Sequence, residues 1–305
     1  MEIIKRPEID IDYDHVIKED TLGVLKDFES VLKDKVLLEL FYRNCNTLVL
    51  DGDSEELRRE YHMAEYDIVQ NKIFYNPELF KDAIMHELFH LSSSVVIDNR
   101  IFTGIMQMDL ETGEVFGIGA NEALTCLLDD KYFKDYTETK GDSLRYSYHI
   151  LKKIMEYIPI LFGDEEVEYY YMSADLPGFL EMLSRYVEPN KALSFMMALD
   201  NIHGCAKIEM DKGYLGPIAT KILFDNYRYA MDVVGEMYMT AVFMQYYENN
   251  ISGEELDDCL GNINHMINSQ LRCTYLPFIK SKKYKPEELE AFNLIVEKKV
   301  IKKYT

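Results

Sequence analysis

Apolar positions recur with the helical period along most of this chain, and strand-like patterns are confined to its first half. An amphipathic helix is expected over residues 19–43, where apolar and polar residues alternate with that period. After residue 135 strand signals fade, and further segments with helical periodicity are separated by Gly, Pro and Asn. These segments cover residues 143–157, 175–187, 191–202, 217–248, 254–271 and 286–303. The second half is therefore expected to be mainly helical.

Short strands are expected in the first half. Residues 47–50 form an apolar run that ends in acidic residues, and residues 67–75 are a second candidate. Residues 101–110 and 115–118 flank a Thr-Gly pair that is typical of a hairpin turn. These strands predict a small mixed sheet.

The elements together predict an α+β fold. A chain of 305 residues can bury a large core and divide into one large domain or two. We expect a mixed subdomain over residues 1–134 and a helical subdomain over residues 135–305, which would form the second wall of a cleft.

One helix of the first half carries the most informative pattern in the sequence. Asn76-Pro77 is typical of its start. Its apolar residues recur at helical spacing: Ile84, Leu88, Leu91 and Val95. On another side lie His86 and His90, four residues apart, with Glu87 beside the first. This spacing puts both imidazoles on one helix face, as two ligands of a zinc ion require.

A catalytic zinc site needs a third protein ligand and an open position for water. The metzincin continuation is excluded, because Ser93 and Val96 stand where that class has a glycine and a histidine. Glu111 and Glu114 flank the predicted hairpin turn, where carboxylates are usually solvated. Glu122 is better placed, on the first turn of a second helix that could pack against the first.

The motif His86-Glu87-Leu88-Phe89-His90, followed by Asn121-Glu122-Ala123-Leu124-Thr125, resembles the gluzincin, or thermolysin-like, zinc metallopeptidases. The resemblance covers residues 67–134 and implies a zincin-like fold. It implies that His86, His90 and Glu122 bind Zn²⁺ and that Glu87 is the general base. It also implies an upstream edge strand, at residues 67–75, that would hold an extended peptide by strand addition.

The chain departs from this family at one position near the metal. Family members commonly carry a carboxylate four residues after the ligand glutamate, and here that residue is Cys126. Asp129 or Asn121 is a candidate to orient a zinc-binding histidine instead. Candidates for the group that stabilises the oxyanion are His203 and Tyr227.

Composition and charge indicate which kinds of partner and which cellular compartment to expect. The chain has 33 basic and 54 acidic residues, and its net charge of -21 disfavours nucleic acid and anionic membranes. Its five cysteines are scattered, and an apolar membrane span or secretory signal is not recognisable, so we expect a cytoplasmic protein. Residues 280–305 carry eight lysines and four glutamates, and an amphipathic helix there is expected to dock on the acidic body.

The sequence therefore predicts a zinc metallopeptidase that acts on a peptide or protein substrate. The alternative is a catalytically silent zinc-binding or peptide-binding regulatory protein of the same fold. The oligomeric state is left open.

Overall fold

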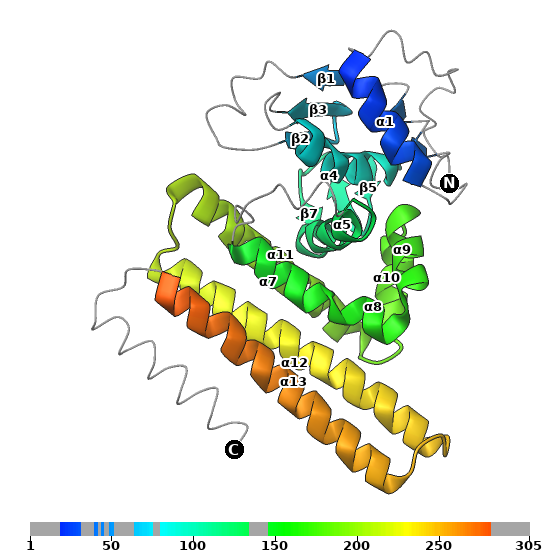
Figure 1. The fold of residues 1–305 in the computed structure, drawn as a ribbon, viewed down its shortest axis with the longest axis vertical. Helices are drawn as coiled ribbons and strands as arrows, with labels where there is room; N and C mark the ends of the chain where they lie inside the picture. The colour runs from blue at the N-terminus through cyan, green and yellow to red at the C-terminus, as the bar shows by residue number, and fades with distance from the viewer. Residues whose placement is uncertain are drawn as a thin grey trace. The chain divides into compact units, whose positions relative to one another are not determined.

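The computed structural model describes residues 19–31, 40–41, 44–45, 49–51, 64–75, 80–133 and 146–281. Within them the protein is a mixed α+β structure that is mostly helical, as predicted, with two small sheets (Figure 1). The chain divides into two compact units, Met1–Ala241 and Val242–Thr305. The boundary expected after residue 134 lies inside the first unit and remains a prediction about subdomains of that unit.

The first sheet is three-stranded, in the order β1-β3-β2. β1 (Val49–Asp51) pairs in parallel with β3 (Lys72–Tyr75), and β2 (Ala64–Asp67) pairs with β3 in the antiparallel direction. β1 confirms the first predicted strand to within a residue or two.

The single strand predicted over residues 67–75 is wrong, because a turn divides it. The Asp67 carboxylate accepts hydrogen bonds from the backbone N–H groups of Val69 and Gln70, at 2.9 Å each. Asn71 then takes a positive φ of 52°, which reverses the chain into β3. In this sheet β3 is the central strand, and the edge strand next to it on the antiparallel side is β2, upstream of the expected one.

The helix with the two histidines, α4, runs from Phe80 to Ser92, and its predicted apolar residues Ile84, Leu88 and Leu91 are fully buried. Val95, which was expected on the same helix face, lies instead in a strand. Serine hydroxyls end the helix. Ser92 donates to the Phe89 carbonyl and Ser94 to the His90 carbonyl, so side chains replace the hydrogen bonds of a further turn.

The second sheet is an antiparallel meander that follows α4 directly. Its strands are β4 (Ser94–Ile97), β5 (Arg100–Thr103), β6 (Met106–Asp109) and β7 (Val115–Phe116), in that order. The predicted turn at Thr112-Gly113 is confirmed between β6 and β7. Residues 101–110 are two strands rather than one, because Gly104 takes a positive φ of 53° between them.

The second helix of the motif, α5, runs from Ile118 to Tyr132. It begins earlier than expected, so Glu122 lies on its second turn rather than its first. An aromatic cluster joins it to α4 and to α1 (Glu19–Val31): Phe28 packs on Phe41, Phe89 and Phe133, with ring centroids 5.0–5.5 Å apart. This buried contact fixes the two motif helices against each other.

The remaining helices fill the second half of the described chain. They are α7 (Tyr146–Met155), α8 (Tyr157–Phe162), α9 (Asp164–Met172), α10 (Leu176–Leu183), α11 (Pro189–Lys212), α12 (Pro217–Tyr247) and α13 (Gly253–Ser281). Figure 1 shows α7 and α11 beside α5, on which both pack. Among the helices that the structure describes, none is long and apolar enough to cross a membrane.

Most predicted helices of this half are confirmed, with shifted ends. α11 continues ten residues beyond the predicted end at 202, since Gly204 lies on an open helix surface and does not interrupt it. α9 was missed because only Val167 and Tyr171 of its nine residues are buried, which leaves little apolar periodicity. The helix predicted over residues 286–303, and its docking, lie outside the described residues.

Candidate metal centre

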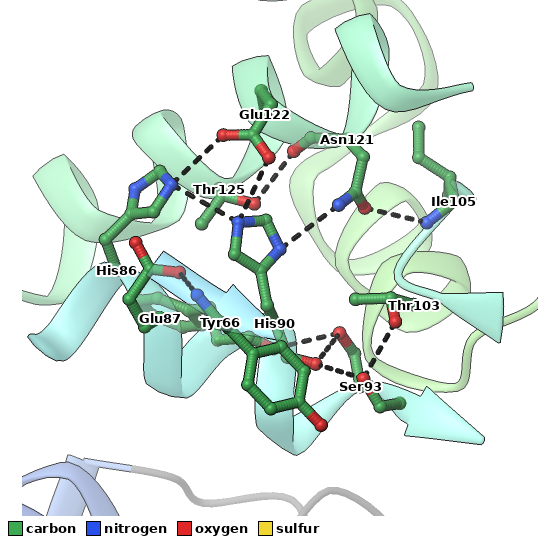
Figure 2. Close-up of polar contacts among 12 residues, drawn as sticks. Tyr66, His86, Glu87, His90, Ser93, Thr103, Ile105, Asn121, Glu122 and Thr125 are labelled. Carbon is green, nitrogen blue, oxygen red and sulfur yellow. Dashed lines mark hydrogen bonds and ion pairs between the residues drawn. The ribbon is translucent and has the colours of Figure 1, made fainter. Parts of the chain in front are cut away.

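Two neighbouring helices supply the three side chains of the candidate centre. His86 and His90 lie one turn apart on α4, and Glu122 projects toward them from α5 (Figure 2). The side chains of His86 and Glu122 are each 17% exposed and that of His90 is 8% exposed. The centre is therefore almost shielded from solvent but not closed.

The three ligand-type groups form a close triangle, in which one atom from each residue lies within 4.8 Å of the other two. The Nε2 atoms of His86 and His90 are 3.3 Å apart. One Glu122 oxygen lies 3.2 Å from His86 Nε2, and the other lies 3.3 Å from His90 Nε2. Among the residues that the structure describes, this is the group of three that could hold a metal ion. The sequence prediction of these three residues as a cluster is confirmed.

The charges of the cluster are strongly coupled. Burial lowers the pKa of His86, but hydrogen bonds to Cys126 and Glu122 outweigh it, and the net pKa lies well above its usual range. Burial raises the pKa of Glu122, yet the two histidines hold the net pKa well below its usual range. Without a metal, these opposite shifts favour a protonated His86 beside an ionised Glu122 carboxylate.

Glu87 points from α4 toward the edge strand β2. Its Oε2 accepts a hydrogen bond from the backbone N–H of Tyr66 at 2.9 Å (Figure 2). Burial raises the pKa of Glu87, and the neighbouring histidines offset only part of that rise. A buried carboxyl group with a raised pKa beside a metal centre has the character of a proton acceptor that can also return the proton.

Asn121 fixes His90 from the side opposite Glu122. Its Oδ1 accepts from the backbone N–H of Ile105 at 3.1 Å, and its Nδ2 lies 3.1 Å from His90 Nδ1. In this arrangement Nδ2 donates to Nδ1, so the His90 proton is on Nε2. A cation at Nε2 would displace that proton, and an amide oxygen turned toward the ring would then accept a proton held on Nδ1. Asn121 thus contacts His90, and its part in orienting a zinc ligand remains a prediction.

Gly104 is a part of the centre that sequence reasoning missed. A Cβ atom at this position would lie 2.1 Å from Asn121 Oδ1 and 2.6 Å from the Tyr171 ring. The Tyr171 hydroxyl is itself 2.7 Å from the Thr125 hydroxyl, which donates to the Asn121 carbonyl. A bare backbone between two strands therefore leaves room for the amide that contacts His90.

α11, from a distant part of the sequence, contacts the start of α5, the helix that carries Glu122. The Asp200 carboxylate accepts hydrogen bonds from Gly117 N–H and Gly119 N–H, at 2.8 and 2.9 Å, so it caps the start of α5. The helices touch at Gly119, where a Cβ atom would lie 2.2 Å from the Leu199 carbonyl oxygen. Nothing in the local sequence marks Asp200, because its partners lie about 80 residues away.

The two oxyanion candidates differ in position. Burial lowers the pKa of His203, and the Glu122 and Asp200 carboxylates partly oppose this, so its ring lies within reach of their charges. It is partly exposed, one turn after Asp200. Tyr227 is fully buried in α12. His203 is thus the better placed of the two, and its role remains a prediction.

The other sequence candidates lie apart from the triangle. Glu111 is exposed on the β6–β7 turn, where it accepts a hydrogen bond from Asn99, and Glu114 is exposed on the same turn. Asp129 is buried on α5, two turns beyond Glu122, and its part in orienting a ligand remains a prediction. Cys126 is buried on the same helix, one turn after Glu122.

Comparison with known proteins adds no relative from which a function could be transferred. Family models, curated protein sequences and solved structures were each compared with this chain, and none matches it significantly. The function therefore has to be argued from the geometry of the centre.

Proposed function

We propose that this chain is a zinc-dependent metallopeptidase of the gluzincin type, with a zincin-like fold around α4, α5 and the two small sheets. The observation that carries the proposal is the triangle of His86, His90 and Glu122. In a tetrahedral zinc site with bonds of about 2.0–2.1 Å, neighbouring ligand atoms lie about 3.3–3.4 Å apart. The two imidazole nitrogens, 3.3 Å apart, match that edge, and each lies 3.2–3.3 Å from one oxygen of the Glu122 carboxylate.

The donor set also suits zinc better than a harder cation. Two imidazole nitrogens and one carboxylate are a common catalytic zinc set, whereas calcium and magnesium prefer oxygen ligands. Three protein ligands leave one tetrahedral position for water. A bound zinc ion would acidify that water and polarise a carbonyl group.

The protein side chains would then move the protons. Glu87 accepts a proton from the attacking water and passes it to the leaving amine nitrogen, for which a raised pKa is suited. His203 would donate a hydrogen bond to the oxyanion. The outer edge of β2 faces this centre through the Tyr66 N–H, so an extended peptide could pair with that strand.

One observation favours the alternative, a catalytically silent protein that binds zinc or a peptide. Glu87 as a residue is 9% exposed, and one of its carboxylate oxygens already accepts a hydrogen bond from the β2 backbone. A general base held in this way would have to release Tyr66 N–H, or use its other oxygen, to reach a water. A cytoplasmic location remains a prediction for either function.

The deciding experiment measures metal content and hydrolysis together on the purified protein. Elemental analysis is expected to find one zinc per chain, and a peptide library is expected to be cleaved. Glu87→Gln should keep the zinc and reduce hydrolysis at least about a hundredfold, because the amide cannot accept the proton of the water. Zinc with no cleavage of any library peptide would favour the silent alternative, and loss of zinc in Glu87→Gln would make Glu87 a ligand.

A further inference from the structure

Tyr171 links the short helix α9 to residues behind the candidate metal centre. It is fully buried, and it is one of two buried residues among the nine of α9, the other being Val167. Its ring packs on the bare backbone of Gly104, where a Cβ atom would lie 2.6 and 2.8 Å from two ring carbons. This side chain therefore joins α9 to the loop between β5 and β6.

The hydroxyl of Tyr171 extends this contact to α5. It lies 2.7 Å from the Thr125 hydroxyl, and Thr125 donates to the backbone carbonyl of Asn121 at 2.8 Å. A hydroxyl has one proton to donate. Because Thr125 donates its proton to the Asn121 carbonyl, the Tyr171 hydroxyl is the donor of the other hydrogen bond. The two bonds form a directed chain from α9 to the helix turn that carries Asn121.

Asn121 is held from two sides, and Tyr171 contacts both of them. The Asn121 Oδ1 accepts from the N–H of Ile105 in the β5–β6 loop at 3.1 Å, and its backbone carbonyl accepts from Thr125 (Figure 2). The Tyr171 ring packs on that loop, and its hydroxyl bonds to Thr125. The remaining amide atom, Nδ2, lies 3.1 Å from His90 Nδ1. The position of the amide at the His90 ring therefore depends on a residue of α9.

We propose that Tyr171 is a positioning residue for metal binding, which holds the Asn121 amide at the His90 ring by fixing both the β5–β6 loop and the turn of α5 that carries Asn121. The inference rests on the proposed zinc site but not on peptidase activity. Groups that orient a ligand ring contribute to metal affinity without touching the metal. In this arrangement the effect of Tyr171 on zinc passes through Asn121, so it should disappear when the amide is absent.

A double-mutant cycle on the full chain distinguishes this role from a purely structural one. Tyr171→Phe removes the hydroxyl and keeps the ring, Asn121→Ala removes the amide, and the two are made singly and together. Tyr238→Phe is the control, because its hydroxyl donates to the Tyr157 carbonyl at 2.8 Å between α12 and α8. Zinc dissociation constants are measured by competition with a chromophoric chelator, and circular dichroism checks that each variant is folded.

Tyr171→Phe is expected to weaken zinc binding about fivefold to tenfold, at the low end for groups that orient a ligand, because it acts one residue further from the metal. In the Asn121→Ala background the same substitution should change zinc affinity less than about twofold, as should Tyr238→Phe in the unchanged protein. In zinc-loaded protein, the NMR signals of the His90 ring should move in Tyr171→Phe, and those of the His86 ring should not.

Three results would overturn the inference while the zinc site stands. They are an equal loss of affinity with and without the Asn121 amide, unchanged affinity in Tyr171→Phe, and equal movement of both histidine rings. If Tyr171→Phe does not fold, Thr125→Val replaces it in the cycle, because it breaks the same chain of hydrogen bonds, and the same outcomes decide. Zinc binding without hydrolysis would overturn only the peptidase, and no zinc binding at all would overturn both proposals.

Discussion

At the scale of single residues, the centre depends on small groups that leave room for larger ones. Gly104 combines a positive φ with contacts that no side chain could share, to Asn121 and to Tyr171. Gly113 has a similar φ, 72°, but nothing within 4 Å of its Cβ position. A comparison of substitutions at Gly104 and Gly113 therefore distinguishes the effect of backbone strain, which both share, from the effect of crowding near the candidate metal centre, which only Gly104 has.

Gly104→Ala is therefore expected to weaken zinc binding and stability, and Gly113→Ala to affect stability alone. Both substitutions should cost about 1–3 kcal/mol of backbone strain. Gly104→Ala should in addition displace the Asn121 amide from His90 and weaken zinc binding at least about tenfold. Urea unfolding and chelator competition measure the two effects. Equal zinc affinity in both variants would contradict a role for Gly104 in the centre.

At Asn121 one substitution is expected to strengthen zinc binding and another to weaken it. In Asn121→Asp both side-chain oxygens can accept, one from Ile105 N–H and one from His90 Nδ1–H, so the amide need not turn when metal binds. We expect tighter zinc binding in this variant and about tenfold weaker binding in Asn121→Ala. Both dissociation constants come from the same chelator assay. Weaker binding in both would show that the amide nitrogen itself is required.

At the scale of elements, one carboxylate ties α11 to the start of α5. Asp200→Ala would leave two backbone N–H groups at a helix N-terminus without their acceptor. Hydrogen bonds to a charged group contribute about 1.5–3 kcal/mol each, so a loss of about 3–6 kcal/mol in unfolding free energy is expected for the two. Asp225→Ala is the control, because its exposed pair with Lys221 should contribute less than about 1 kcal/mol. Similar values for the two in urea unfolding would contradict the tether.

The same scale shows why element boundaries were harder to predict than elements. α4 was recognised from its apolar period, but its end is set by serine hydroxyls that return to the helix backbone. Residues 67–75 have the composition of one strand, yet the Asp67 side chain and the positive φ of Asn71 make them a turn and a strand. Local hydrogen bonds from side chains to the backbone set both of these boundaries, and they cannot be predicted from residue composition.

At the scale of the whole molecule, metal binding should be coupled to the stability of the first compact unit, which contains α4, α5 and α11. Zinc at a hundredfold excess over its dissociation constant adds about 2.7 kcal/mol if it binds only the folded state. For a unit of this size that raises the melting temperature by roughly 5–10 °C. Differential scanning fluorimetry with and without chelator measures the shift. The shift should vanish in His90→Ala, and its persistence there would place the metal elsewhere.

The sequence by itself determined the parts of the centre that are local. Two histidines four residues apart lie on one face of any helix, so α4 could be recognised as a candidate metal-binding element without the rest of the fold. It also favoured Glu122 over Glu111 and Glu114, because the first lies in a helical pattern and the others in a turn. The tertiary structure then placed Glu122 3.2–3.3 Å from both rings.

Only the tertiary structure decided which groups support those ligands. The contacts of Glu87 with Tyr66, of Asn121 with Ile105 and of Asp200 with Gly117 span 16 to 83 residues of sequence. Each depends on how two elements pack, and a hydrogen bond forms only when packing brings donor and acceptor to about 3 Å. The residues that could bind a metal could therefore be predicted from the sequence. The residues that contact them could not, because packing of distant elements brings them together.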